Sequence, residues 1–148
     1  MKVRPATRAC AAVMGDVHAA AFDAPWTADD IRRFAEGPGG FALVAEAGDQ
    51  VAGFILCRVM AGEAEVLTLA VRPEHRRRGV AGALVEQAAL VAADGARTLF
   101  LEVAADNPGA IALYERTAFT PIGRRAAYYA RPGAPAVDAI VMRRTLNR

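Results

Sequence analysis

The chain has 148 residues and a mass of 15.6 kDa, a size that predicts one domain spanning residues 1–148. Hydrophobic residues make up 54% of it and charged residues 23%, which excludes a mainly disordered chain. The formal net charge is only +2, so the overall charge does not predict binding to nucleic acid or to a membrane surface.

Cysteine and histidine are too sparse and too scattered to form a metal site or a disulfide framework. Cys10 and Cys57 belong to no C-x-x-C pattern, and His18 and His75 lack partners at ligand or catalytic-triad spacing. No stretch approaches the ~18 uninterrupted apolar residues of a membrane helix. We therefore expect a cytoplasmic protein with free thiols and no metal, in which the two histidines serve packing and surface roles.

The first half of the chain predicts two helices followed by three strands. Apolar residues recur every three or four positions from Thr7 to Ala21, which is typical of an amphipathic helix. Thr27 is a favoured N-cap for a second helix that ends at Gly37. Three β-rich runs predict strands over residues 41–46, 51–60 and 65–71, of which the first two form a hairpin through Gly48-Asp49.

The second half predicts helices alternating with strands. A helix follows from Val80 to Ala93, and Asn107-Pro108 is a favoured start for another that continues to about Arg116. Strands are expected over residues 98–103, 119–127 and 136–143, with a Pro/Gly-rich loop at residues 131–135. This order of elements indicates an α/β fold, specifically an α+β arrangement with a mixed sheet.

A basic, glycine-bearing loop lies where the third strand passes into a helix. It comprises Arg76, Arg77, Arg78, Gly79, Val80, Ala81 and Gly82. The helix has no Ser, Thr, Asp or Asn cap ahead of it, so its free N–H groups are suited to bind a phosphate. The loop is neither a Walker A sequence nor a G-x-G-x-x-G fingerprint. A solvated arginine run or a nucleic-acid patch is the alternative, but the glycines favour a small molecule that carries a pyrophosphate.

The spacing Arg76-x-x-Gly79-x-Ala81 after Leu69-Ala70-Val71 resembles the acetyl-CoA pyrophosphate loop of the GCN5-related N-acetyltransferases (GNAT). The resemblance extends over nearly the whole chain, because other family motifs follow in order: Leu101-Glu102-Val103, Asn107, Ala112-Leu113-Tyr114-Glu115 and Phe119. It implies the GNAT acyl-CoA N-acyltransferase fold, with acetyl-CoA as the co-substrate.

A narrower resemblance is to the bacterial ribosomal protein alanine N-acetyltransferases of the RimI type. It is carried by Pro25-Trp26-Thr27, Arg124-Arg125 with Tyr128-Tyr129, and Asp138-Ala139-Ile140-Val141-Met142. One extra small residue between Arg125 and Tyr128 departs from the family pattern. The resemblance implies acetylation of the N-terminal alanine of a small-subunit ribosomal protein, and possible partners among the tRNA threonylcarbamoylation proteins.

Two residues are candidates for the chemistry of acetyl transfer. Glu102 is the expected general base, because an α-amino group titrates near pH ~8 and needs only a modest base. Tyr114 is the expected general acid, because a phenol of ordinary pKa near ~10 stays protonated at neutral pH and can protonate a departing thiolate. The structural alternatives are an exposed or ion-paired strand carboxylate for Glu102 and a core aromatic for Tyr114.

The remaining candidates are binding residues. The backbone of Leu69, Ala70 and Val71 is expected to pair with the pantetheine arm as an added strand, and a backbone N–H here could stabilise the oxyanion. The resemblance adds a CoA contact for Asn107, whose N-cap role explains it equally well. The expected acceptor-binding residues are Trp26, Arg125, Tyr128 and Tyr129.

Other functions are compatible with the same motifs. The acceptor could be another protein N-terminus, a lysine side chain or a small-molecule amine, although a pocket for small amines is expected to carry more acidic residues. A module that binds CoA or the ribosome without turnover belongs to a different class, and the presence of Glu102 and Tyr114 argues against it.

Overall fold

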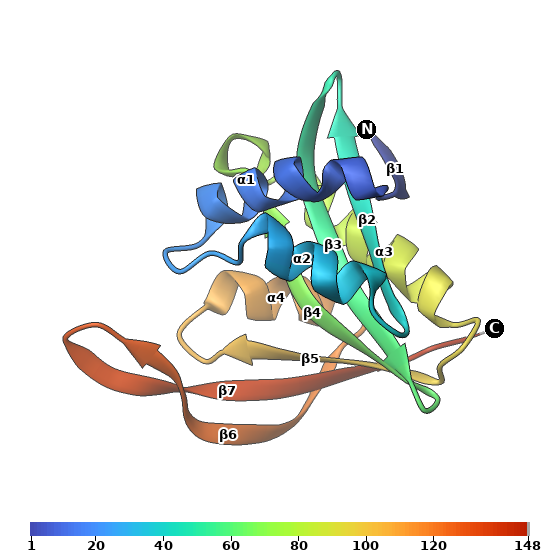
Figure 1. Cartoon of the computed structure of the whole chain (residues 1–148). Helices are drawn as coiled ribbons and strands as arrows, with labels where there is room; N and C mark the ends of the chain where they lie inside the picture. Colours follow the sequence, from blue (N-terminus) through green and yellow to red (C-terminus); the bar gives the residue numbers. More distant parts are fainter. Residues whose placement is uncertain (148) are drawn as a thin grey trace.

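The computed structural model describes residues 1–147, which form one seven-stranded mixed sheet in the order β1-β2-β3-β4-β5-β7-β6 (Figure 1). The strands are β1 (Lys2–Pro5), β2 (Gly40–Ala47), β3 (Gln50–Met60), β4 (Glu63–Val71), β5 (Thr98–Ala104), β6 (Thr120–Arg131) and β7 (Ala134–Thr145). The helices are α1 (Ala11–Ala21), α2 (Ala28–Glu36), α3 (Val80–Ala92) and α4 (Pro108–Arg116), and short 3-10 turns precede α1 and α3. The expected α/β fold is confirmed.

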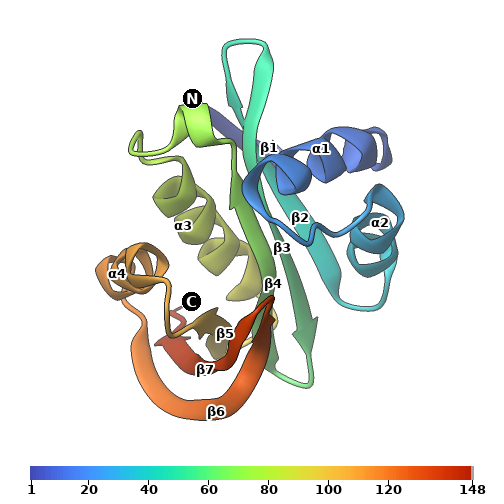
Figure 2. The ribbon, with the colours of Figure 1, turned by 90° about the vertical axis from the view of Figure 1, so that its left-hand side faces the viewer.

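The sheet separates two hydrophobic cores (Figure 2). Helices α1 and α2 cover one face, where Met14, Val17 and Ile31 pack on Phe54 and Leu56. Helices α3 and α4 cover the other face. That larger core contains Leu84, Val85, Ile55, Leu99, Leu101, Val103 and Met142. Within residues 1–147, no helix is both long and apolar enough to cross a membrane.

Two features of the strands differ from the expectation. The short strand β1, which pairs with β2 from Lys2↔Glu46 to Pro5↔Leu43, was not predicted, because four residues with two charges and a proline carry no strand pattern. The Pro/Gly-rich segment is a tight turn rather than an open loop, since Arg131 pairs with Ala134. Gly133 adopts φ +68° there, a conformation that glycine takes without strain.

An irregularity in β4 opens the centre of the sheet. Cys57 pairs with Val66 and the preceding residue Leu56 pairs with Thr68, so Leu67 is an extra residue in β4. Such a bulge bends a strand. The parallel pairing of β4 with β5 accordingly covers only residues 63–65 of β4, against Thr98–Phe100. Beyond that point the two strands diverge, and we call the space between them the β4/β5 split.

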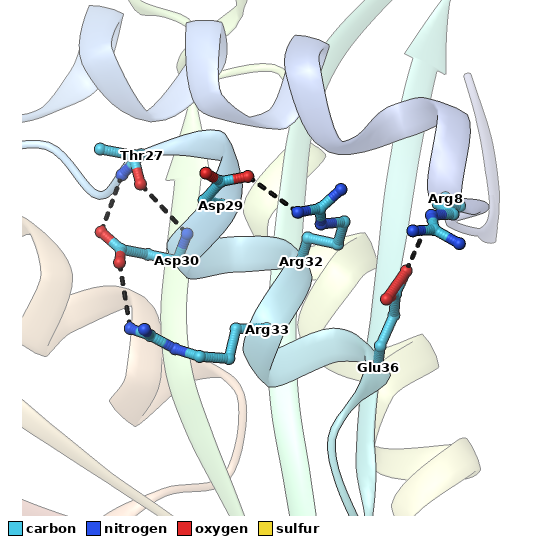
Figure 3. Close-up of polar contacts among 7 residues, drawn as sticks. All are labelled: Arg8, Thr27, Asp29, Asp30, Arg32, Arg33 and Glu36. Atoms are coloured by element: carbon cyan, nitrogen blue, oxygen red, sulfur yellow. Dashed lines mark hydrogen bonds and ion pairs between the residues drawn. The ribbon is translucent and has the colours of Figure 1, made fainter.

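Helix α2 begins with a capping box, as the sequence predicts for Thr27 (Figure 3). The Asp30 N–H donates to Thr27 Oγ1 at 3.1 Å, and the Thr27 N–H donates to Asp30 Oδ2 at 3.1 Å. Exposed ion pairs continue along the helix, joining Asp29 to Arg32 and Asp30 to Arg33. The cap fixes the start of α2 and therefore the end of the α1–α2 connection.

The buried His18 ties that connection to the sheet. Its Nδ1 accepts a hydrogen bond from the Trp26 N–H at 3.0 Å, which leaves the proton on Nε2, and Nε2 lies 3.0 Å from Thr68 Oγ1 on β4. The ring also stacks on Phe22, with the ring centroids 4.3 Å apart. Burial lowers the pKa of His18 below its ordinary value of 6.5. The neutral ring therefore joins α1, the α1–α2 connection and β4.

Removing the capping hydroxyl should weaken α2. We expect Thr27→Ala to lower the free energy of unfolding by about 1 kcal/mol, because the Asp30 N–H loses its acceptor. Thr27→Ser keeps an oxygen at the same position and should retain most of the stability. Urea denaturation monitored by circular dichroism measures both variants, and equal midpoints for Thr27→Ala and the native protein would contradict the role of the cap.

The stability should fall in mild acid because of His18. Its pKa is depressed in the folded state, so between its folded pKa and about 6.5 the unfolded chain binds a proton that the folded chain does not. The free energy of unfolding should therefore decrease by at most about 1.4 kcal/mol per pH unit as the pH falls below that value. His18→Gln should remove this slope, measured by urea denaturation between pH 7.5 and 5.5.

His75→Gln is the matched control, since it removes the other histidine of the chain and leaves His18 in place. A slope that vanishes in His75→Gln and persists in His18→Gln would contradict the assignment. Asp30, Asp106 and Asp138 do not interfere in this range, because their hydrogen-bond partners hold their pKa values below the ordinary 3.8.

Candidate active site

The β4/β5 split provides an unpaired strand edge in the middle of the molecule. Within residues 1–147, β4 has no strand partner on its β5 side from Val66 onward, which includes the predicted cofactor strand Leu69, Ala70 and Val71. The backbone groups there are available to an extended, amide-rich molecule that adds as a strand. Figure 2 shows α3 and α4 on one side of this region and the α1–α2 connection on the other.

The basic loop leads from β4 into the N-terminus of α3 in a form suited to an anion. Gly79 is the N-cap residue at φ +78°, it provides no side-chain cap, and no acidic residue lies in the first turn. A Cβ built on Gly79 or on Gly82 meets no atom within 4 Å, so there is open space above the helix start. Free N–H groups at a helix N-terminus favour a phosphate.

The arginines of this loop are exposed, and among residues 1–147 none of them forms an ion pair. Arg77 takes a left-handed conformation at φ +64°, which helps the loop turn before Gly79. The first helical residues differ in role, because Val80 is buried in the core while Ala81 is only half-buried. The helix start therefore combines arginines that have no ion-pair partner in the described residues with free backbone N–H groups. Both features favour binding of a pyrophosphate.

Glu102 lies on β5 on the face opposite the large core, as the alternation of Leu101 and Val103 predicts. Its side chain is 20% exposed, and Oε1 lies 3.4 Å from Nη2 of Arg125. The other oxygen, Oε2, is buried and has no hydrogen-bond partner. The ion-paired alternative thus describes one oxygen only, and the second has unused capacity to accept a proton or a hydrogen bond.

Tyr114 lies on α4, is only 9% exposed and meets Phe119 edge-to-face at 5.6 Å between ring centroids. Burial raises its pKa to about 12, with smaller contributions from Tyr129 and Cys57. The ordinary phenol pKa assumed from the sequence is therefore wrong, because the ring is part of the core. Within the described chain its hydroxyl has no hydrogen-bond partner, so it is free to donate.

The aromatic and basic residues of β6 gather beside Glu102. The guanidinium carbon of Arg125 lies 5.4 Å from the ring centroid of Tyr128, and Tyr128 and Tyr129 meet edge-to-face at 5.0 Å. Burial raises the pKa of Tyr129, and the nearby Glu102 carboxylate raises it further. Arg131, over the Tyr129 ring at 5.7 Å, forms a two-pronged bond to Asp106 ahead of α4. Glu102, Tyr129 and Tyr114 are thereby brought into one neighbourhood.

Trp26 and Asn107 are placed less distinctively. Trp26 is half-buried and packs on Phe34, with centroids 5.4 Å apart, at the edge of the smaller core. Asn107 is the N-cap of α4, and its Oδ1 accepts from the Ala110 N–H at 3.1 Å. The helix-cap role of Asn107 is therefore realised, and Trp26 lies at the edge of a core. The α1–α2 connection that carries Trp26 and the β6–β7 hairpin extend to the same side of the molecule (Figure 1).

Sequence reasoning missed two contributors to this region. His18 was expected only to pack, yet it bridges the Trp26 backbone and Thr68. Asp138 was noted only as part of a motif, yet it bonds the backbone of β6. Long-range hydrogen bonds of this kind leave no periodic signal. Among residues 1–147, no three His, Cys, Asp or Glu side chains are grouped to hold a metal ion.

Comparisons with known proteins agree with this geometry. A model of the acetyltransferase (GNAT) family matches residues 12–119. N-alpha-acetyltransferase RimI of Mycobacterium tuberculosis is 33% identical over 144 residues, covering 93% of this chain and 88% of that protein. The ribosomal protein bS18-alanine N-acetyltransferase of Salmonella typhimurium is 40% identical over 102 residues, 68% of each chain.

The solved structures agree in fold. The ribosomal-protein-S18-alanine N-acetyltransferase of Escherichia coli superposes with a TM-score of 0.90 at 26% identity, covering 99% of this chain and 94% of that one. The family model covers most of the sheet and all of α3 and α4. The chain therefore belongs to the GNAT acetyltransferase family and is an N-acetyltransferase.

Proposed function

We propose that the chain acetylates the N-terminal alanine of a small-subunit ribosomal protein, with acetyl-CoA as the acetyl donor. The observation that carries the proposal is the carboxylate of Glu102, with one orphaned oxygen, beside the β4/β5 split. The names of the relatives support the acceptor, because the Salmonella protein is called a bS18-alanine N-acetyltransferase. A cytoplasmic location fits such an acceptor, and partners in tRNA threonylcarbamoylation stay a prediction from the resemblance.

Residues along one path would hold acetyl-CoA. The pyrophosphate would lie at the N-terminus of α3, against the free amides from Gly79 to Gly82 and the charges of Arg76, Arg77 and Arg78. The pantetheine amides would pair with the free edge of β4 at Leu69, Ala70 and Val71. Asn107 caps α4 with its side-chain oxygen. Its side-chain nitrogen is not used by the cap and would be a further hydrogen-bond donor for the cofactor.

Glu102 would take the proton of the acceptor amine, directly or through a water molecule. An α-ammonium has a pKa near ~8, so a carboxylate in contact with it removes its proton at modest cost near neutral pH. Arg125 forms an ion pair with Glu102, in which Nη2 lies 3.4 Å from Oε1, a long distance for such a contact. A bound ammonium can therefore replace this guanidinium or use the unpaired Oε2.

Tyr114 would protonate the departing thiolate. Its pKa of about 12 suggests a poor acid against an ordinary thiol near ~8.5. Burial acts on thiols in the same direction, since it raises the pKa of Cys57 in the same core to about 12. A departing thiolate that is likewise shielded from water would be a stronger base than in solution, which favours its protonation by Tyr114.

Direct transfer is favoured over an acyl-enzyme. Cys57 is fully buried, and a thiol with a pKa of about 12 is a negligible nucleophile at neutral pH. Cys10 is buried in the smaller core, near Arg4 and Thr7 and away from Glu102. The amine would thus attack the thioester carbonyl itself, forming the amide as the carbon–sulfur bond breaks and the thiolate takes the Tyr114 proton.

Replacing the proposed base should cost most activity. We expect Glu102→Gln to lower kcat/KM for an alanine-starting peptide by ~100-fold, with the largest loss below pH ~8, where the amine is mainly protonated. Glu65→Gln is a matched control, since it also removes an ion-paired strand carboxylate. Full activity of Glu102→Gln at every pH would sink the proposal.

The proposed acid should affect turnover rather than binding. Tyr114→Phe keeps the edge-to-face packing on Phe119 and should lower kcat by ~10-fold or more, with little change in acetyl-CoA affinity measured by calorimetry. The effect should shrink for thioesters whose thiol is more acidic, because such a leaving group needs no proton. An equal loss with both kinds of thioester would argue against proton donation.

The acceptor class is tested by competition among amines. At equal concentration near pH 8, an alanine-starting peptide should react at least ~100-fold faster than a peptide with an acetyl-blocked N-terminus and an internal lysine, because far less of a lysine amine is neutral. Spermidine tests the small-amine alternative in the same assay. Faster acetylation of spermidine or of the lysine peptide would assign the enzyme to the alternative acceptors.

A further inference from the structure

The strand β6 carries an unusual bulge beside the proposed acceptor site. Arg125 pairs with Ala139 and Tyr129 pairs with Val137, so residues 126–128 lie opposite the single residue Asp138. Within them Ala127 has φ +51°, the left-handed region that a residue with a Cβ adopts only at a cost. The extra small residue expected between Arg125 and Tyr128, by which the sequence departs from the RimI pattern it resembles, falls within this bulge.

Asp138 closes the bulge with both of its carboxylate oxygens. Oδ1 accepts the Ala127 N–H at 2.9 Å, and Oδ2 accepts from Arg124, 3.1 Å from Nε and 3.0 Å from Nη2. The bond to the Ala127 N–H is the first cause of the lowered pKa of Asp138. The side chain therefore bonds the left-handed residue itself and Arg124, three positions before it.

Arg125, which meets Glu102, is the last paired residue of β6 before the bulge. Strand β7 lies between β5 and β6, and the register places Arg125, Ala139, Val141 and Glu102 on one face. Arg125 reaches Glu102 across β7 above the small, fully buried Ala139. Asp138 lies next to Ala139 and therefore projects from the other face, so it influences this contact only through the backbone of β6.

We propose that Asp138 is a positioning residue for the acceptor side of the site, acting by holding the β6 bulge that sets Arg125 against Glu102 and aligns Tyr128 and Tyr129. The proposal rests on the proposed role of Glu102 in binding the acceptor amine. The acetyl-CoA path along β4 and α3 shares no residue with the bulge. Loss of the Asp138 bond should therefore change acceptor binding and leave acetyl-CoA binding intact.

The experiment compares Asp138→Ala with Asp138→Asn in the full chain. The alanine variant removes the acceptor of the Ala127 N–H, whereas the asparagine variant keeps an oxygen for it and loses the charge and the second oxygen, which accepts from Arg124. We expect Asp138→Ala to raise KM for an alanine-starting peptide by ~10-fold, with the KM for acetyl-CoA within ~2-fold of the native value. Asp138→Asn should restore the peptide KM to within ~3-fold.

Arg124→Gln is the matched control, because it breaks the exposed ion pair and leaves the bond to the Ala127 N–H. It should change the peptide KM by less than ~2-fold, as expected for an exposed pair. Hydrogen exchange of the segment 126–129 gives a readout independent of activity: it should accelerate at least ~10-fold in Asp138→Ala and stay near native in the other two variants.

The outcomes separate this proposal from the proposed function. Unchanged exchange, or an unchanged peptide KM, in Asp138→Ala would overturn the positioning role. Equal increases in both KM values would show a general structural role instead, and would also overturn it. If no alanine-starting peptide is acetylated by the native protein, the proposed function fails, while the exchange experiment still shows whether Asp138 holds the bulge.

Discussion

The divergence of β4 from β5 is the constraint on which the rest of the site depends. One extra residue, Leu67, bends β4, and the parallel ladder ends after Glu65. Backbone N–H and C=O groups left unpaired inside a sheet need another partner. The split therefore offers a row of hydrogen-bonding groups to an extended ligand, with the N-terminus of α3 following directly along the chain. A regular sheet of the same sequence length would have had no opening for a substrate.

The two faces of the sheet provide different surroundings for the proposed acid and base. Tyr114 projects into the large core with Cys57, and burial raises the pKa of both groups to about 12. Glu102 lies on the other face, partly exposed and beside Arg125. The proposed proton donor thus has buried surroundings, whereas the carboxylate stays accessible to a cationic amine.

The arginine-rich composition also has a structural explanation. The arginines of β6 are engaged with carboxylates, since Arg124 pairs with Asp138, Arg125 with Glu102 and Arg131 with Asp106. The arginines of the basic loop, at residues 76–78, have no such partners in the described part of the chain. A protein with a formal net charge of only +2 therefore still places three adjacent arginines, without ion-pair partners among the described residues, at one helix start, where an anionic ligand can use their charge.

Most of the elements could be predicted from local patterns. The Thr27 cap, the Gly48-Asp49 turn and the start of α4 at Asn107-Pro108 depend on neighbouring residues, and these expectations are confirmed. The short strand β1 could not be predicted, because its pairing with β2 joins residues some forty positions apart. The same limit applies to the bond between His18 and Thr68.

The sequence by itself determined the order of the elements from α1 onward, the apolar faces and the basic loop at a helix start, because each follows from the periodicity and chemistry of adjacent residues. Only the tertiary structure decided the bulge in β4, the burial of Tyr114 and the approach of Arg125 to Glu102 across β7. Strand register and burial depend on which distant segments pack together. They are therefore settled by the folded chain as a whole.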